Sequence, residues 1–78
     1  MAKEVKVYST VTWPWCFKVK QLLDENKVTY KSYDVARDKI ARDEMLSKTG
    51  KFVVPVVDID GEISLGYDEK WLKQKLNL

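Results

Sequence analysis

A proline marks the point where a strand-like stretch of this chain gives way to a helix-like stretch, and that junction restricts the possible folds. Residues 4–8 alternate polar and apolar side chains in the period of a β-strand, so we expect a strand over about residues 3–9. The fixed φ angle of proline suits the first turn of a helix, so a helix should begin at Pro14 and end near residues 26–27. Its apolar side chains recur at three- and four-residue spacing, at Cys16, Val19, Leu22 and Leu23.

Cys16 should lie in the first turn of this helix, where backbone N–H groups lack helical partners. The positive end of the helix dipole favours a thiolate there, so the position suits sulfur chemistry. Cys16 is the only cysteine of the chain, and histidine is absent. An internal disulfide, a Cys-His catalytic pair and a metal site of imidazole and thiolate ligands are therefore excluded within one chain, and we expect no metal cofactor.

The residues that follow predict a second strand and a second helix. Residues 28–33 alternate again, and the order strand, helix, strand implies a parallel pair joined by a right-handed crossover. Asp34 can cap a helix that ends at Gly50. The apolar side chains expected on the buried side of this helix are Ala36, Ile40, Ala41 and Met45.

The last third of the chain predicts a hairpin and a short helix. Pro55 cannot donate a sheet hydrogen bond, so a third strand should start around it. Asp60-Gly61 is typical of a two-residue hairpin turn, so residues 62–65 should return as an antiparallel strand. Asp68 can cap the final helix. The side chains expected to pack this helix on the sheet are Trp71 or Leu72, and Leu76.

Together these elements predict an α/β fold of order βαβ-αββα, with a four-stranded mixed sheet flanked by three helices. A chain of 78 residues has room for one modest core, so we expect a single domain over residues 1–78. The 14 basic and 12 acidic residues are mixed along the chain and leave a net charge of +2, which gives no basic stripe for nucleic acid. Without a membrane-spanning run or a signal-peptide pattern, we expect a soluble, cytoplasmic protein.

Three short motifs stand on these elements: Trp13-Pro14-Trp15-Cys16, Val53-Val54-Pro55 and Gly66-Tyr67-Asp68. Their order and spacing, over essentially the whole chain, resemble the small bacterial, clostridial-type glutaredoxins, which have the thioredoxin fold. In that family the first motif is Cys-Pro-aromatic-Cys. The resemblance therefore puts the nucleophilic cysteine of the family at position 13, where this chain has Trp13, and the resolving cysteine at Cys16.

The resemblance implies a glutathione-dependent thiol–disulfide oxidoreductase that acts on protein or small-molecule disulfides, and a monomer rather than a dimer. In the family's mechanism the first thiolate attacks a disulfide, and the second cysteine can close an intramolecular disulfide. Trp13 can do neither, so the form with tryptophan should be inactive. For Cys16 in this chain, the simpler interpretation is a small buried side chain of low reactivity that packs on the helix.

A glutathione site built from all three motifs is also implied by the resemblance. A cis bond before Pro55 would turn the backbone of Val54 outward to pair with the cysteinyl unit of glutathione as an added strand. The start of the last helix can hold the γ-glutamyl carboxylate, while Asp68 meets the ammonium group. Lysines are the candidates for the glycine carboxylate. The residues expected to contact glutathione are Trp15, Lys20, Lys51, Val54, Pro55, Gly66, Tyr67 and Asp68.

Three explanations of Trp13 remain open. The substitution could be engineered to trap an inactive form, or the lineage could have lost its nucleophile and kept the fold for binding. The third concerns the gene: the tryptophan codon UGG differs by one base from the cysteine codons and from UGA, which encodes selenocysteine in some bacterial genes. We therefore hypothesise that the natural residue is cysteine or selenocysteine.

Two other functions compete with the glutathione-linked enzyme. The first is a redox-silent module that binds glutathione or a protein. The second is an electron donor to ribonucleotide reductase that is reduced by thioredoxin reductase, which predicts no affinity for glutathione. An iron–sulfur scaffold is disfavoured, because relatives that bridge a cluster use the first cysteine of the motif.

Overall fold

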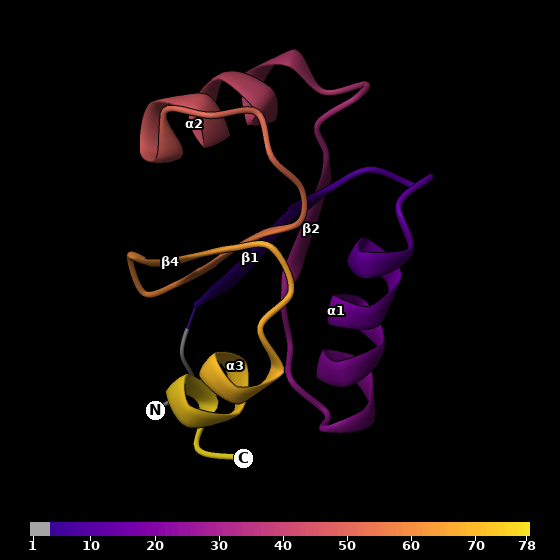
Figure 1. The fold of residues 1–78 in the computed structure, drawn as a ribbon, viewed down its shortest axis with the longest axis vertical. Helices are drawn as coiled ribbons and strands as arrows, with labels where there is room; N and C mark the ends of the chain where they lie inside the picture. The colour runs from indigo at the N-terminus through magenta and orange to yellow at the C-terminus, as the bar shows by residue number, and fades with distance from the viewer. Residues whose placement is uncertain (1–3) are drawn as a thin grey trace.

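The computed structural model describes residues 4–78, so the first residue of the strand expected over 3–9 lies outside the described residues. Within this range the chain forms a strand, a helix, a strand, a helix, two strands and a helix, in the order predicted (Figure 1). Their bounds are Val5–Ser9 (β1), Pro14–Glu25 (α1), Lys31–Asp34 (β2), Lys39–Thr49 (α2), Val56–Ile59 (β3), Glu62–Leu65 (β4) and Glu69–Leu76 (α3).

The four strands form one mixed sheet in the order β2-β1-β3-β4. β1 runs parallel to β2 and antiparallel to β3, and β3 pairs with β4 as an antiparallel hairpin. In the register of the sheet, Tyr8 lies opposite Tyr33 on one side and Val56 on the other, and Val56 lies opposite Leu65. The predicted α/β fold with a parallel pair and a returning hairpin is confirmed.

Alternation along the central strands divides the core between the two faces of the sheet. Val5 and Val7 of β1 belong to a buried cluster with residues of α1 and α3, whereas Tyr8 belongs to a second cluster with Met45 of α2. In Figure 1, α2 lies on one side of the strands, and α1 and α3 lie on the other. No helix within the described range is both long enough and apolar enough to span a membrane.

The start of α2 differs from the prediction. Asp34 does not cap this helix, because its Oδ1 accepts a hydrogen bond from the Ala36 amide within the turn that follows β2. Asp38 is the cap instead, with its Oδ1 accepting from the Ala41 amide at 3.1 Å. Ala36 therefore lies before the helix and is exposed.

Ile40 was also predicted to be buried on α2, and that prediction is wrong. Ala41 and Met45, four residues apart, face the sheet and are 3% and 0% exposed. Ile40 points about 100° away from Ala41 around the helix and is 80% exposed. The prediction failed because neighbouring residues of a helix cannot both face one narrow core.

β2 begins at Lys31, later than the predicted start at residue 28. Residues before it are used to end α1: Lys27 has a positive φ of 57°, and the Val28 amide donates to the Leu23 carbonyl at 2.9 Å. Such a bond satisfies a free carbonyl at the helix end and takes the chain out of the strand conformation there. Tyr30 then packs against the core cluster of α1 and α3.

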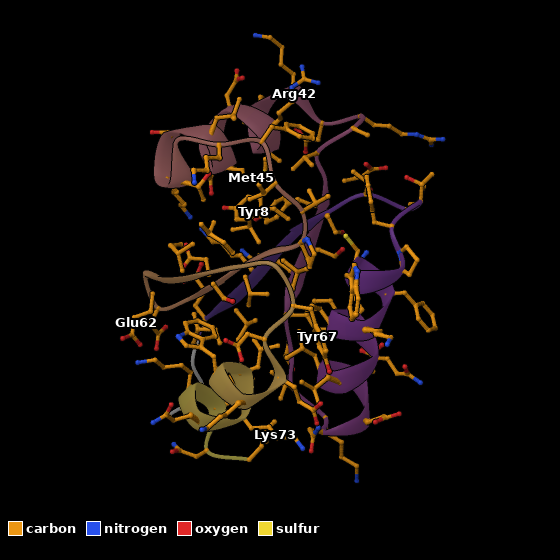
Figure 2. The ribbon with its side chains drawn as sticks, viewed as in Figure 1. Tyr8, Arg42, Met45, Glu62, Tyr67 and Lys73 are labelled. Atoms are coloured by element: carbon orange, nitrogen blue, oxygen red, sulfur yellow. The ribbon has the colours of Figure 1, made fainter. Side chains whose placement is uncertain are left out.

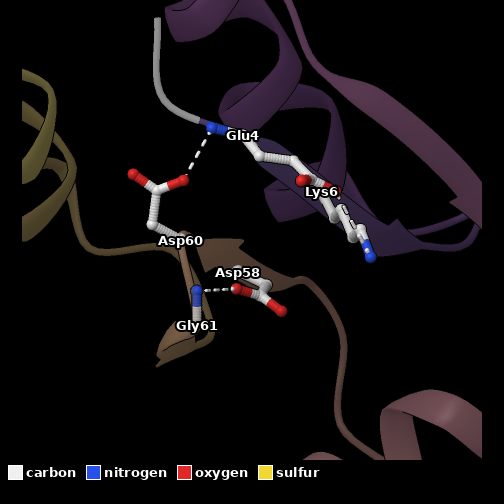
Figure 3. A pocket seen from close by; sticks show the side chains of 5 residues that line it. All are labelled: Glu4, Lys6, Asp58, Asp60 and Gly61. Atoms are coloured by element: carbon white, nitrogen blue, oxygen red, sulfur yellow. Dashed lines mark hydrogen bonds and ion pairs between the residues drawn. The ribbon is translucent and has the colours of Figure 1, made fainter. Parts of the chain in front are cut away.

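The other predicted boundaries are confirmed by local geometry. Gly50 ends α2 with a φ of 73°. Asp60 and Gly61 have φ values of 51° and 90°, as a two-residue hairpin turn requires. Figure 3 shows how this turn is fastened: Asp58 Oδ1 accepts from the Gly61 amide, and Asp60 Oδ1 accepts from the Glu4 amide, both at 2.8 Å.

A polar network beneath α2 joins the sheet to that helix. Tyr8, which is 0% exposed, donates its hydroxyl hydrogen bond to Glu44 and accepts one from Lys48 at 3.0 Å. Lys48 also binds Asp58 of β3 at 2.6 Å. In Figure 2, Tyr8 lies between the strands and α2, next to Met45. The network connects β1, α2 and β3 through one ammonium group.

The network shifts the pKa values of its members. Burial and the hydrogen bond to Glu44 raise the pKa of Tyr8 from 10.0 to about 12. Burial alone would raise the pKa of Asp58, but the hydrogen bonds from Lys48 and from the Gly61 amide hold it below its usual value. Burial alone would lower the pKa of Lys48, but the hydrogen bonds that it makes raise it.

Removing the ammonium group should destabilise the fold. Lys48→Met leaves the Asp58 carboxylate, whose side chain is 8% exposed, without its cationic partner. We expect the free energy of unfolding, measured by urea titration, to fall by about 2 kcal/mol. Lys39→Met is the matched control, since it breaks an exposed i,i+4 pair with Asp43 on the same helix and should change little. Equal losses in the two variants would contradict this role of Lys48.

Stability should also fall at alkaline pH through Tyr8. The folded protein holds the phenolic proton more tightly than the unfolded chain, so the tyrosine contribution is complete below about pH 10 and is lost as the pH rises toward 12. We expect a loss of about 2 kcal/mol from this group in urea titrations over that range. Tyr8→Phe should flatten this alkaline decline, whereas an unchanged pH dependence would show that Tyr8 is not its source.

Candidate functional site

Position 13 lies at the N-terminus of α1, immediately after the loop that leaves β1. Trp13 is the N-cap residue, with extended backbone angles (φ −97°, ψ 124°) and no capping hydrogen bond from its side chain. Pro14 follows as the first helical residue, as predicted, and the Trp13 carbonyl accepts from the Cys16 amide at 3.1 Å. The Trp13 side chain is 56% exposed, so position 13 presents its side chain to solvent at the positive end of the helix dipole.

Cys16 lies in the first turn of α1 and is buried. It is a free cysteine, 1% exposed, on the face of α1 that carries Val19 and Leu23 into the core. The expectation of a buried side chain is confirmed. No acidic residue occupies the first turn of α1, so no nearby carboxylate on that turn opposes a thiolate.

The second and third motifs meet beside this helix. The Val54–Pro55 bond is cis, as the resemblance implied. The Gly66 amide donates to the Pro55 carbonyl at 2.7 Å, which ties the end of β4 to the start of β3. A groove of about 190 Å³ results, lined by Trp15, Val54, Pro55, Gly66 and Tyr67. Five of the residues predicted to contact glutathione are thus brought together.

One wall of this groove is a stack of aromatic rings. The rings of Trp15 and Tyr67 lie 6.0 Å apart between centroids and 23° from parallel, and Lys18 Nζ lies 4.6 Å from the Trp15 ring on α1. Figure 2 shows Tyr67 between α1 and α3. The Tyr67 hydroxyl donates to Glu69 at 3.4 Å, and burial followed by the charge of Glu69 raises the pKa of Tyr67. The stack connects α1 to the start of α3.

Two further hollows continue from this groove along the surface. One, of about 260 Å³, is lined by Trp13, Phe52, Val53 and Val54, and shares Val54 with the groove. The other, of about 190 Å³, shares Trp13 with the second hollow. Its lining residues are Thr10, Val11, Trp13, Cys16, Phe17 and Lys20. We call these three adjoining hollows the trough, and Trp13 lines two of them.

Of the three remaining predicted contacts, Asp68, Lys20 and Lys51, only Lys20 lines the trough. Asp68 caps α3, with its Oδ1 accepting from the Trp71 amide at 3.0 Å, as predicted from the sequence. Lys20 lines the hollow beyond Trp13. Lys51 is exposed next to Phe52 and lines none of the three hollows, so the structure does not bring it to the trough. In the described part of the chain, no group of three His, Cys, Asp or Glu side chains is placed to hold a metal ion.

Sequence reasoning missed three exposed apolar residues of the trough. Val11, Phe17 and Phe52 are 77%, 68% and 53% exposed. A usable indication was present for Phe17, because it does not belong to the apolar stripe of Cys16, Val19, Leu22 and Leu23 that packs the helix. An apolar side chain outside the packing stripe, next to a suspected site, indicates a contact surface rather than core.

Comparison with protein families matches residues 5–63 to the glutaredoxin family. A glutaredoxin-like 8.6 kDa protein of the rubredoxin operon of Clostridium pasteurianum is 40% identical over 65 residues, which span 83% of this chain and 87% of that protein.

Solved structures are similar over nearly the whole chain. The crystal structure of a thioredoxin-like protein matches 94% of this chain and 100% of its own, with a TM-score of 0.89 and 36% identity. The crystal structure of a buckwheat glutaredoxin–glutathione complex matches 96% of this chain and 74% of its own, with a TM-score of 0.76 and 27% identity. The expected thioredoxin-like glutaredoxin fold is confirmed.

The burial of Cys16 predicts a slow thiol. We expect a small aromatic disulfide reagent to modify Cys16 at least about 100-fold more slowly in the folded protein than in urea, because a buried sulfur must first be exposed. Trp13→Ala should raise the rate in the folded protein, since Trp13 and Cys16 line the same hollow. Trp15→Ala, which removes an equally exposed indole from the neighbouring groove, is the control. A fast reaction in the unmodified protein would contradict the buried position.

Proposed function

The chain belongs to the glutaredoxin family of thiol–disulfide oxidoreductases, and from this premise we propose that it is a glutathione-dependent oxidoreductase whose nucleophile belongs at position 13. The observation that carries the proposal is the placement of position 13. It lies exposed at the N-terminus of α1, in the middle of a trough that the other two motifs of the family line. A thiolate or selenolate there would be stabilised by the helix dipole and open to a disulfide.

The proposed reaction is thiol–disulfide exchange. The thiolate at position 13 attacks the glutathione sulfur of a mixed disulfide; a new disulfide with glutathione forms, the old bond breaks, and the departing thiolate takes a proton from water. A second glutathione thiolate then attacks this disulfide, which releases oxidised glutathione and restores the starting thiolate. Alternatively, Cys16 displaces the glutathione and closes an intramolecular disulfide. Its place one turn below position 13 suits this resolving role.

Glutathione would lie along the trough as an extended peptide. The backbone of Val54 pairs with the cysteinyl unit of glutathione. This unit would lie between the rings of Trp15 and Tyr67 on one side and position 13 on the other. The N-terminus of α3 receives the γ-glutamyl carboxylate, and Asp68 receives the ammonium group through the carboxylate oxygen not used for capping. Either Lys20, or Lys51 after a change of side-chain conformation, receives the glycine carboxylate. The buckwheat complex with glutathione supports this choice of ligand.

The chain with Trp13 lacks the proposed chemistry, since indole is no nucleophile toward disulfides and Cys16 is buried. We therefore propose that the natural residue at position 13 is cysteine or selenocysteine. The codon decides this point: UGA or a cysteine codon agrees with the proposal, whereas UGG rules it out. We further propose a single cytoplasmic domain that acts as a monomer on protein or small-molecule disulfides.

A redox-silent binding module is the second candidate, and one observation favours it. Trp13 takes the N-cap position of α1 with extended backbone angles, and its side chain lines two of the three hollows. A chain that had lost its nucleophile could therefore keep the trough for binding. This candidate predicts that the unmodified chain binds glutathione and that restoring the nucleophile adds no activity.

Restoring a thiol at position 13 should create the activity. In a coupled assay that measures reduction of a glutathione mixed disulfide, we expect no rate above background for the unmodified chain and at least about a 100-fold increase for Trp13→Cys. Trp13→Cys combined with Cys16→Ala should keep activity with glutathione mixed disulfides, because the second glutathione replaces the resolving thiol. Trp15→Cys, two residues further along the chain, is the control for a misplaced thiol. Inactive Trp13→Cys protein with a native unfolding transition would refute the enzyme.

A further inference from the structure

The hollow beyond Trp13 holds no part of glutathione when Lys51 receives the glycine carboxylate, and Lys20 can then bind another ligand. It lies on the side of Trp13 away from Val54, between the loop that leaves β1 and the first two turns of α1. Val11 and Phe17 form its rim and are 77% and 68% exposed, more than Trp13 itself. Two large apolar side chains thus frame a hollow that adjoins the proposed reaction site at position 13.

The size of this hollow suits one apolar side chain. Its volume is about 190 Å³. A protein cavity of about 150 Å³ lined by apolar residues holds a benzene molecule. The side chain of a leucine, methionine or phenylalanine therefore fits between Val11 and Phe17, beside position 13, and would cover apolar surface that is now in water.

The positive charge beside this hollow suits a ligand that carries a carboxylate next to its apolar side chain. Lys20 lines it and is half-buried, and no residue within 4–78 forms an ion pair with Lys20. Lys18, one turn away from Trp15 on the same helix, adds a second cation at this end of α1. The first turn of α1 carries no acidic residue to neutralise them. A half-buried cation without a partner favours an anionic ligand.

We propose that this hollow is a docking subsite for the disulfide-bearing partner protein, and that it binds an extended segment in which the reactive cysteine is followed by a large apolar residue and an acidic residue. The inference rests on the proposed function, because the partner cysteine must meet the nucleophile at position 13. The apolar side chain enters between Val11 and Phe17, and the carboxylate meets Lys20. The subsite therefore selects among protein disulfides that carry the same glutathione group.

A second copy of this chain is a poorer occupant of the same surface. Two copies that met face to face would bring the lysines of both α1 helices together, and like charges in a contact region oppose association. A partner that covers this surface should instead present apolar and acidic side chains. The proposal therefore commits to a partner segment of opposite charge.

Four short peptides can test the subsite. Each carries one cysteine as a mixed disulfide with glutathione, followed by Leu-Glu, Leu-Gln, Ser-Glu or Ser-Gln. The protein is the Trp13→Cys, Cys16→Ala double variant without glutathione reductase, and the measured quantity is the ratio of peptide thiols released in competition, read by mass spectrometry. The thiolate at position 13 attacks the glutathione sulfur, the protein–glutathione disulfide forms, and the peptide thiolate leaves and takes a proton from water. The same competition with free cysteine as the attacking thiol corrects for differences in peptide reactivity.

We expect about a tenfold preference for the Leu peptides over the Ser peptides, and a smaller preference for Glu over Gln. Phe17→Ser should abolish the Leu preference, and Lys20→Gln should abolish the Glu preference. Ile40→Ser is the matched control, because Ile40 is equally exposed but lies on α2 and lines none of the hollows. It should leave both ratios unchanged.

The failures of the two proposals are distinguishable. Equal release of the four peptides by a protein that reacts with them would overturn the docking subsite and leave the enzyme proposal standing. No reaction with any of them would overturn the enzyme proposal. In that case, the subsite is tested by titrating the unmodified chain with the same peptides and following its tryptophan fluorescence. Tighter binding of the Leu-Glu peptide than of the other three, lost in Phe17→Ser, supports the subsite. Equal binding of the four peptides overturns it.

Discussion

The pairing register of β1 determines where every part of the candidate site lies. β1 is the central strand that pairs with both β2 and β3, and Tyr8 lies opposite Val56. Because β3 is antiparallel, the end of β1 meets the start of β3, and residues 10–13 reach the edge where residues 53–55 begin. Val56 in turn lies opposite Leu65, so the connection to α3 arrives at the same edge. A slip of one residue would reverse the faces of the side chains and separate the three motifs.

The two faces of the sheet hold this register in different ways. On the α1 and α3 face, apolar alternation alone buries Val7 and Val57 against the helices. On the α2 face, the ammonium group of Lys48 joins Tyr8 of β1 and Asp58 of β3. Because this polar network lies away from the trough, the ionisation of its groups stabilises the fold without adding charge to the reaction site. The trough itself is mainly apolar, with the start of α3 at one end and Lys20 at the other.

Much of the fold could be predicted because it depends on neighbours a few residues apart. Pro14 starts α1, Asp60 and Gly61 make the hairpin, and Asp68 caps α3, as their local chemistry predicts. The start of α2 was misplaced because Asp34 and Asp38 are chemically equivalent caps, and only the turn that follows β2 commits Asp34 to the Ala36 amide. Local pattern cannot choose between two such side chains.

The sequence by itself determined the order of the elements and the three family motifs on which the proposed position of the reactive group depends, because helix caps, turns and period-two alternation act within a few residues. Tertiary structure decided which distant side chains meet. Lys48 bonds to Tyr8, 40 residues away in the sequence, and Trp15 stacks on Tyr67. Phe17 is exposed, because it lies outside the apolar stripe that packs α1 against the core. Such contacts depend on sheet register and on the angle at which each helix packs, which no short stretch of sequence specifies.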